Sequence, residues 1–416
     1  MKQVFTIIAL IVILCAFNGP VCALPNPKPI SVQQQADAET LFRTAYSLYR
    51  EGKYDEALAK CTEAVTLNPN DYRARALRGY IYIAQKKWKD ASDAFAEAIR
   101  LQPGVKEIYL AKAEVDRFRN ANDEAIAGAR KATELDPNYA LAYAGLADAY
   151  RALAVGSEMP PIEFTSKSAA YSKKAIELDD SLSEGHSGLG MTTFWGQWNW
   201  SGAETQYKRA LELNPNSSMA HLFYAHMLSN TGRHPEALAE AAIARELDPL
   251  FPFTGALEGQ FLNHAGQTDE ALARLQKTFE LDPNFWMPHL FASSAYIEKG
   301  NYDQAVAEAE LATKLGPSQT ASIAFESYAL AKLGRVDEAR ALLDGLLKLS
   351  AERFVPPNHI ALIYNGLGEK DNALAWLEKA FEQHDPKMAF LKVEPKWNNL
   401  RAEPRFVALM KKMNLE

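Results

Sequence analysis

The chain has 416 residues, of which 48% are hydrophobic and 23% are charged, and its formal net charge at pH 7 is −7. This composition is too apolar for a globally disordered protein. The mild acidic excess contains no long run of one sign, so the sequence indicates neither a basic nucleic-acid surface nor a patch for anionic lipids. The length suits two or three ordinary domains or one long repeat array.

Residues 1–23 have the pattern of a secretory signal peptide. Lys2 precedes an uncharged, apolar run at residues 4–17, which is short for a membrane span but typical of a signal-peptide core. After a helix-breaking Asn-Gly-Pro, Val21 and Ala23 stand at the −3 and −1 positions of a cleavage site. We therefore predict cleavage after Ala23 and a location in the periplasm or outside the cell. The alternative is an uncleaved signal that anchors the chain in the inner membrane.

Residues 24–37 are predicted to form a proline-rich linker. Their first twelve residues read LPNPKPISVQQQ. Three prolines and a polar tail favour an extended, solvated segment. The folded part of the chain is therefore expected to begin at Ala38.

A 34-residue period runs through the rest of the chain. The phrase Leu-x-Pro recurs at this spacing in two groups that end at Pro69, Pro103 and Pro137, and at Pro215, Pro249, Pro283 and Pro317. A glycine series has the same period, at Gly232, Gly266, Gly300, Gly334 and Gly368. An alanine series is in phase with both, at Ala57, Ala91, Ala125, Ala203, Ala237, Ala271, Ala305, Ala339 and Ala373.

These spacings predict two helices in each repeat. The glycine falls between the helices, where a short turn requires a permissive backbone. The alanine falls early in the second helix, where a larger side chain would overpack a close helix crossing. The proline ends the second helix. Neither helix can bury its apolar face alone, so neighbouring repeats are expected to stack into a solenoid.

A 34-residue helix–turn–helix unit of this kind resembles the tetratricopeptide repeat. The resemblance covers residues 38–386, and the chain is similar to bacterial extracytoplasmic arrays of this repeat. It implies an all-α, right-handed superhelical solenoid of about ten units. The units are predicted to begin near Ala38, Tyr72, Lys106, Ala140, Ser183, Ser218, Pro252, Trp286, Thr320 and Phe354. The fourth unit is atypical, because Asp180 replaces its proline and extra residues predict a longer loop at 155–165. The helix after this loop is expected to resume before Ser168.

Residues 387–416 are predicted to cap the array. Pro386, Pro395 and Pro404 prevent a continuous helix. An apolar stripe follows the last of these prolines, at Phe406, Leu409, Met410 and Met413. We expect this stripe to cover the exposed face of the final repeat.

No constellation of residues in the sequence indicates catalysis. The eight histidines lack the His-Glu-x-x-His spacing of a zinc site, and Cys61 alone lies outside the predicted signal, so neither a cysteine metal site nor an internal disulfide is expected. The glycine-rich run at residues 185–190 follows a helix instead of a strand, so close helix packing explains it better than a phosphate loop. We therefore predict a protein that is not an enzyme and has no metal or cofactor.

The resemblance implies that the first helix of each unit lines a concave groove. The side chains predicted to contact a partner there are Tyr46, Tyr49, Tyr80, Phe118, Phe194, Trp195, His226, Asn230, Gln260 and Asn263. Aromatic anchors with adaptable amides suit an extended peptide or a partner helix. The Lys and Asn of the family's carboxylate clamp are replaced by Phe42 and Tyr46, so recognition of a C-terminal carboxylate is not expected.

Alternatives stay open at these positions. Each aromatic residue can instead pack between repeats. Residues 194–200 include three tryptophans, of which Trp198 and Trp200 are interpreted as a hydrophobic plug where the fourth unit meets the fifth, while Trp195 stays open between this role and a partner contact. The predicted function is a non-catalytic scaffold or adaptor that binds protein segments outside the cytoplasm. A sensor that binds a small ligand in the same groove is the alternative, and an enzyme comes third.

Overall fold

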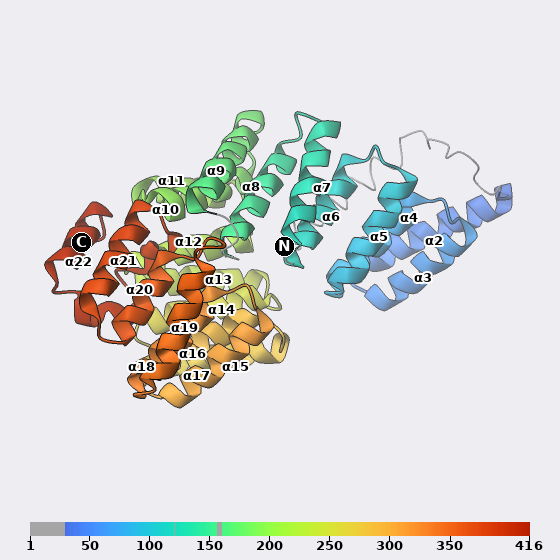
Figure 1. The fold of residues 1–416 in the computed structure, drawn as a ribbon. Helices are drawn as coiled ribbons and strands as arrows, with labels where there is room; N and C mark the ends of the chain where they lie inside the picture. Colours follow the sequence, from blue (N-terminus) through green and yellow to red (C-terminus); the bar gives the residue numbers. More distant parts are fainter. Residues whose placement is uncertain (1–29, 120, 156–159) are drawn as a thin grey trace. The chain divides into compact units, whose positions relative to one another are not determined.

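The computed structural model describes residues 30–119, 121–155 and 160–416. The predicted signal peptide and residues 24–29 of the predicted linker lie outside these ranges. Regular secondary structure within them is entirely helical (Figure 1). No helix in the described ranges combines the length and the apolar character that crossing a membrane requires.

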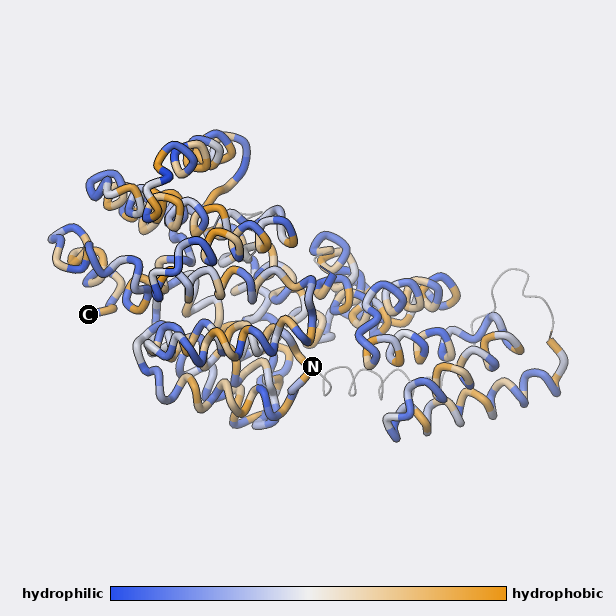
Figure 2. Tube along the Cα trace, turned by 90° about the horizontal axis from the view of Figure 1, so that it is seen from below, coloured by the Kyte–Doolittle hydropathy of each residue, from blue (hydrophilic) through white to orange (hydrophobic). Residues whose placement is uncertain are grey.

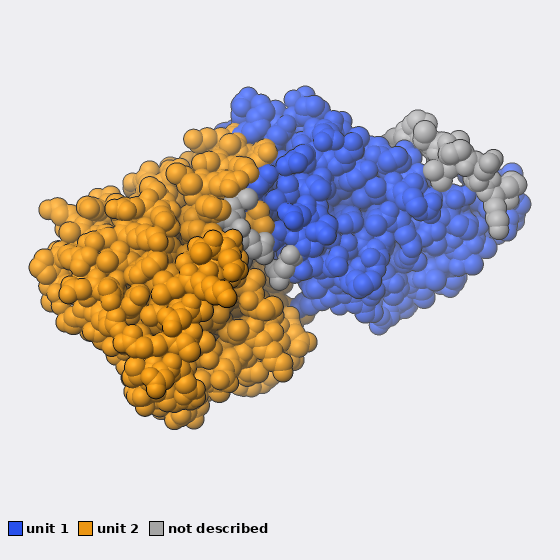
Figure 3. Space-filling view, in the orientation of Figure 1, with its two compact units in different colours: residues 1–152, 174–180 blue, residues 153–173, 181–416 orange. Residues whose placement is uncertain are grey.

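The chain divides into two compact units, which Figure 3 distinguishes by colour. Unit 1 comprises residues 1–152 and 174–180, and unit 2 comprises residues 153–173 and 181–416. The boundary passes through the fourth repeat, which consists of α8 (Ala140–Val155) and α9 (Pro161–Leu178). The first three repeats, in unit 1, are α2 (Val32–Arg50) with α3 (Tyr54–Leu67), α4 (Tyr72–Ala84) with α5 (Trp88–Leu101), and α6 (Lys106–Phe118) with α7 (Asn122–Leu135).

Unit 2 continues with six further helix pairs and a C-terminal part. The first three pairs are α10 (Ser183–Gln197) with α11 (Trp200–Leu213), α12 (Ser218–Asn230) with α13 (His234–Leu247), and α14 (Pro252–His264) with α15 (Thr268–Leu281). The next three are α16 (Trp286–Glu298) with α17 (Tyr302–Leu315), α18 (Thr320–Lys332) with α19 (Val336–Leu349), and α20 (Pro357–Gly366) with α21 (Lys370–Glu382). The C-terminal part consists of the 3₁₀-helices η1 (Pro386–Phe390) and η2 (Pro395–Leu400) and the α-helix α22 (Pro404–Lys412).

The predicted repeat chemistry is confirmed. The turn glycines all have left-handed backbone angles, from φ 73° at Gly300 to φ 84° at Gly232. The alanines of the series are at most 1% exposed, because each lies where two helices cross. Figure 2 shows apolar residues recurring along each helix, as expected for helices that bury one face against their neighbours.

The predicted starts of eight units, from Tyr72 to Thr320, coincide with the first residues of first helices. The other two differ. The last first helix, α20, begins at Pro357 and not at Phe354, because Pro356 and Pro357 delay its start. At the other end, α2 begins at Val32, so residues 32–37 are helical and the prediction of an extended linker is wrong there.

The early start of α2 has a local cause. The Ser31 hydroxyl accepts a hydrogen bond from the amide of Gln34 at 3.1 Å, and the Gln34 side chain accepts one from the amide of Ser31 at 2.9 Å. This reciprocal arrangement is a capping box, which satisfies amides that a helix start leaves without partners.

The predicted loop at residues 155–165 is shorter than expected. Helix α9 resumes at Pro161, and the extra residues mostly lengthen α8 to 16 residues and α9 to 18.

Candidate interaction surfaces

The two ends of the repeat stack of unit 2 are in direct contact. The ring of Trp198 stacks on the rings of Phe381 at 5.2 Å and His384 at 5.0 Å between centroids. The indole nitrogen of Trp200 donates a hydrogen bond to the carbonyl oxygen of Met413 at 2.7 Å. Unit 2 is therefore a closed ring of repeats, in which the turn between α10 and α11 and the first residue of α11 meet α21 and the end of α22 (Figure 1).

Two of the residues that close the ring of repeats, Trp198 and His384, have unusual backbone angles. Trp198 has φ 50° and His384 has φ 52°, values in the left-handed region that favours glycine. Trp198 stands 34 residues before Gly232, so it occupies the place of the turn glycine in its repeat. The plug was predicted where the fourth unit meets the fifth, whereas the structure places Trp198 and Trp200 against the C-terminal end of unit 2.

Residues 385–400, which we call the inner segment, lie against the first helices of unit 2. The segment begins at Asp385, which is fully buried and accepts hydrogen bonds from the amides of Asn358 at 3.0 Å and Lys387 at 2.9 Å. Burial raises the pKa of this carboxyl to about 6. The Asp385 side chain therefore caps η1 and fixes it against the start of α20.

Aromatic contacts fix the next part of the inner segment. The Phe390 ring lies 5.6 Å from His226 of α12 and 6.0 Å from His264 of α14, between ring centroids. The ammonium group of Lys387 lies 5.4 Å from the ring centroid of Trp195 of α10, within the range of a cation–π interaction. The segment thus contacts three successive first helices.

Lys396 is the most buried cation of the inner segment, at 3% exposure. Its ammonium group donates hydrogen bonds to the Ser294 hydroxyl at 2.6 Å and to Glu394 Oε1 at 2.7 Å. It also lies 3.6 Å from Glu298 Oε1 and 4.7 Å above the Phe325 ring. Burial acts to raise the pKa of Glu394, but Lys396 outweighs it and lowers that pKa below its ordinary value. This buried charge is therefore paired, as its removal from water requires.

The backbone of the inner segment is also recognised. The Asn365 side chain on α20 donates a hydrogen bond to the carbonyl oxygen of Lys396 at 2.6 Å, and its Oδ1 accepts one from the side-chain amide of Asn399 at 2.7 Å. We call the residues of α10, α12, α14, α16, α18 and α20 that contact this segment the inner face of unit 2. Because the Asn365 amide binds a backbone carbonyl, this contact does not depend on the side chains of the segment.

Most residues of unit 2 that the sequence predicts as partner contacts are buried, and the inner segment contacts two of them, Trp195 and His226. Phe194 and Asn230 are 0% exposed, His226 and Asn263 are 4% exposed, and Trp195 is 6% exposed. Gln260 alone keeps an intermediate exposure. Phe194 packs on the Trp200 ring at 5.6 Å between centroids, within the core of its own repeat, so its prediction as an exposed anchor is wrong.

Several buried polar atoms on the first helices of unit 2 have no hydrogen-bond partner among the described residues. They are the Trp195 indole nitrogen, His226 Nε2, both amide atoms of Asn230, Gln260 Oε1 and Asn263 Oδ1. Burial lowers the pKa of His226 to about 3 and that of His264 to about 4, so both are neutral at pH 7. The intramolecular contact therefore leaves part of the inner face unsatisfied.

In unit 1, the structure divides the predicted contacts into two groups. Tyr80 is 0% exposed and packs edge-on against Phe95 at 5.0 Å, so its prediction as a surface anchor is wrong. Its hydrophobic ring is needed in the core between repeats. Tyr46, Tyr49 and Phe118 are only partly buried. Phe118 stacks on the Trp88 ring at 5.3 Å, which holds it in a defined orientation.

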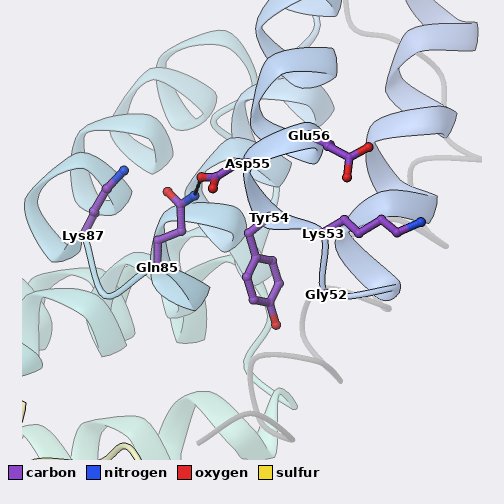
Figure 4. A pocket seen from close by; sticks show the side chains of 7 residues that line it. All are labelled: Gly52, Lys53, Tyr54, Asp55, Glu56, Gln85 and Lys87. Atoms are coloured by element: carbon purple, nitrogen blue, oxygen red, sulfur yellow. Dashed lines mark hydrogen bonds between the residues drawn. The ribbon is translucent and has the colours of Figure 1, made fainter.

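Unit 1 also has two surface hollows. One, of about 340 Å³, is lined by Arg43, Tyr46, Ser47, Arg50 and Glu51 of α2 and the turn that follows it. The other, of about 540 Å³, lies at the turn edge of the first two repeats and is lined by Gly52, Lys53, Tyr54, Asp55, Glu56, Gln85 and Lys87 (Figure 4). Figure 4 shows Lys53 and Lys87 on opposite sides of the hollow, so the cations do not converge on one point. Within the described residues, no group of His, Cys, Asp and Glu side chains could hold a metal ion.

A sequence pattern broader than the prolines alone marks the short helices of the inner segment. An acid–Pro–base triplet recurs every nine residues, as Asp385-Pro386-Lys387, Glu394-Pro395-Lys396 and Glu403-Pro404-Arg405. Each proline begins a short helix, and the acidic side chains of the first two triplets accept hydrogen bonds from the amides of their lysines. The prediction of a terminal cap holds for Phe406, Leu409 and Met413, which are at most 1% exposed. The inward path of the two preceding turns was not predicted.

Family models of the tetratricopeptide repeat match residues 48–115 and 262–324, 192–250, 358–383 and 324–344, which together make up more than half of the chain. The chain belongs to the tetratricopeptide repeat family. Members of this family generally act as non-catalytic scaffolds for protein–protein interaction, and this is the function that family membership supports.

Solved structures with a similar fold include yeast Tom70, with 15% identity, a TM-score of 0.43, and coverage of 91% of this chain and 99% of Tom70. The MamA protein has 18% identity and a TM-score of 0.36 over 44% of this chain and 94% of its own. A thermophilic tetratricopeptide repeat protein of Thermus thermophilus has 21% identity and a TM-score of 0.37 over 46% of this chain and 98% of its own. Comparison with curated proteins gave no match. Because these identities and TM-scores are low, family membership rests on the family models and on the repeat itself.

Proposed function

We propose that the chain is a non-catalytic interaction scaffold that acts outside the cytoplasm, and that a protein segment binds the first helices of unit 1. The observation that carries this proposal is the contrast between the two units. The first helices of unit 2 are covered by the inner segment. The described residues of unit 1 consist of helix pairs and their turns, and Tyr46, Tyr49 and Phe118 stay partly exposed on α2 and α6.

The chemistry of these three residues suits a protein segment. Large aromatic side chains supply much contact area at a low cost in side-chain entropy, which is why they are frequent among residues that dominate binding energy. Arg117 lies 4.3 Å above the Phe118 ring and is paired with Glu114 at 2.9 Å, so polar groups surround the aromatic one. An apolar anchor within a polar rim is the arrangement that extended peptides and partner helices use.

The binding test compares two variants with a matched control. Tyr46→Ala and Phe118→Ala are expected to weaken binding of a partner, captured from an envelope extract, by about 2 kcal/mol or more if they are dominant contacts. Thr62→Ala, on the exposed side of α3 in the same repeat as Tyr46, should leave affinity unchanged. Circular dichroism must first show that each variant keeps its helix content. Equal affinity for all three folded variants would contradict binding at these first helices.

The location outside the cytoplasm is supported by the signal-peptide pattern of residues 1–23. Mass spectrometry of the protein purified from its native host should find Leu24 at the mature N-terminus. An intact segment from Met1 to Ala23 would instead support a membrane-anchored protein.

A sensor for a small polar ligand is the second candidate. The buried polar atoms without partners in unit 2, on Trp195, His226, Asn230, Gln260 and Asn263, favour it, because a ligand with complementary donors and acceptors would satisfy them. A ligand that binds the folded state alone would raise the melting temperature of the isolated protein. A scaffold would show such stabilisation only with its protein partner.

A further inference from the structure

The inner segment contacts unit 2 in the way that a bound peptide contacts a receptor. It forms no helix pair of its own, and consists of two short 3₁₀-helices that begin at Pro386 and Pro395. Its buried apolar side chains, Met388, Leu391, Trp397 and Leu400, join the hydrophobic core of the last repeats and are each at most 2% exposed. Three further contacts fix its position: the Phe390 ring on two histidines, the Lys396 ammonium on Ser294 and Glu298, and a backbone carbonyl on Asn365. All of these groups are far from their partners in sequence, and Ser294 and Lys396 are 102 positions apart.

Some buried polar groups of the inner face lack hydrogen-bond partners. Trp195, His226, Asn230 and Asn263 each have a buried polar atom without a hydrogen-bond partner among the described residues, and each such atom costs free energy. At the entrance to the segment, His384 has a left-handed backbone that a non-glycine residue adopts only with strain. A competitor that satisfied the buried amides without this strain would gain affinity relative to the chain's own segment.

From these contacts we propose that the inner face of unit 2 is a peptide-binding site, occupied in this structure by residues 385–400, for which partner segments of the same chemistry compete. The partner class is a flexible protein segment with an acid–Pro–Lys turn and an aromatic residue six positions before the lysine. In the chain's own segment these are Glu394-Pro395-Lys396 and Phe390. The inference extends the proposed scaffold function to unit 2 and rests on that function.

Each element of this chemistry has a defined receptor group. The lysine enters a site made by the Ser294 hydroxyl, the Glu298 carboxylate and the face of Phe325, which together select a flexible cation. The acid two positions before it, Glu394 in the chain's own segment, accepts a hydrogen bond from the ammonium group at 2.7 Å. The aromatic side chain lies on His226 and His264, both neutral, so a charged residue at that place would be buried without a partner.

The test uses the full chain and a fluorescent peptide with the sequence of residues 384–401. Lys396→Met weakens the chain's own segment, and should raise the affinity for the peptide at least tenfold over the wild type, measured by fluorescence polarisation. Lys411→Met, at an exposed lysine of α22, is the matched control and should behave as the wild type does. Adding Ser294→Ala to Lys396→Met, or replacing the lysine that corresponds to Lys396 in the peptide by methionine, should reduce this binding at least tenfold.

Absence of peptide binding to a folded Lys396→Met variant would overturn the proposal and make the segment a permanent part of the core. Hydrogen exchange of the wild type provides a second test that does not depend on the variant. Amides of residues 385–400 should exchange at least 100-fold faster than those of α12 and α16, because the segment opens while the repeats stay folded. If the amides of residues 385–400, α12 and α16 exchanged at the same rate, the proposal would also be overturned. Failure of these tests leaves partner binding at Tyr46 and Phe118 in unit 1 untouched, so the two proposals can fail separately.

Discussion

Two histidines beneath the inner segment make the stability of unit 2 depend on pH. Burial lowers the pKa of His226 to about 3 and that of His264 to about 4, whereas their ordinary value is 6.5. Below pH 6.5 the unfolded chain therefore binds more protons at these sites than the folded chain does. Their contribution to the free energy of unfolding decreases as the pH falls from about 6.5 toward 4. Asp385 acts in the opposite sense, because its raised pKa of about 6 removes stability as the pH rises from about 4 to 6.

Replacing His226 with Gln isolates one of these contributions. Between pH 6.5 and pH 5, the variant is expected to lose about 1–2 kcal/mol less unfolding free energy than the wild type, because one proton uptake on unfolding is removed. Urea unfolding at several pH values measures this difference. If the unfolding free energies of the two proteins changed in parallel with pH, burial would not lower the pKa of His226.

Ala271 belongs to the series of alanines at helix crossings and is 0% exposed. Ala271→Leu is expected to reduce the free energy of unfolding by about 1–3 kcal/mol through overpacking. Because repeats interact mainly with their neighbours, hydrogen exchange should increase chiefly at residues 252–317. Ala239→Leu, at an exposed position of α13, is the control and should change stability little. An unchanged midpoint for Ala271→Leu would mean that the crossing has room for a larger side chain.

At the level of single residues, the sequence predicts what a strict period repeats. The turn glycines and the crossing alanines were found because each recurs at 34 residues and has one physical reason for its identity. Tyr80 was wrongly assigned to the surface, because an aromatic residue on a first helix can point to a partner or to the core. Its neighbour Gly79, where an added Cβ would lie 2.8 Å from the Phe95 ring, shows how tightly that crossing is packed.

At the level of elements, Trp200 joins the first complete repeat of unit 2 to α22. Trp200→Phe keeps an aromatic ring but removes the hydrogen bond to the Met413 carbonyl. We expect a loss of about 1 kcal/mol, the usual net value of such a bond, and faster amide exchange in α22. Trp376→Phe on α21 is the matched control. Unchanged exchange at residues 404–415 would show that other contacts alone hold the helix.

The helices themselves could be predicted well, and their departures have local causes. Eight predicted unit starts coincide with helix starts because apolar spacing and the preceding turn both specify them. The start of α2 was missed because Ser31 and Gln34 form a capping box inside what reads as a polar tail. In the fourth repeat, the extra residues extend α8 and α9, because helix formation satisfies backbone groups that a loop would leave to water.

At the level of the whole molecule, the candidate site was predicted only in part. The sequence places partner contacts on the first helices, and in the structure two of those of unit 2, Trp195 and His226, contact the inner segment. That this segment belongs to the same chain depends on contacts across more than 100 residues, such as that between Lys396 and Ser294. A repeat period describes neighbours alone, so it contains no information on contacts that return across several repeats.

Ring closure also determines how unit 2 tolerates changes in length. An open stack can gain or lose a repeat at the cost of one local interface, because each repeat contacts only those beside it. In unit 2, the stack of Trp198 on Phe381 and His384 fixes the number of repeats that separate them. A 34-residue duplication placed between α13 and α14 would move these rings apart and expose them. The same duplication between α5 and α6 would leave them together, so the modularity of the family applies to unit 1 and is lost in unit 2.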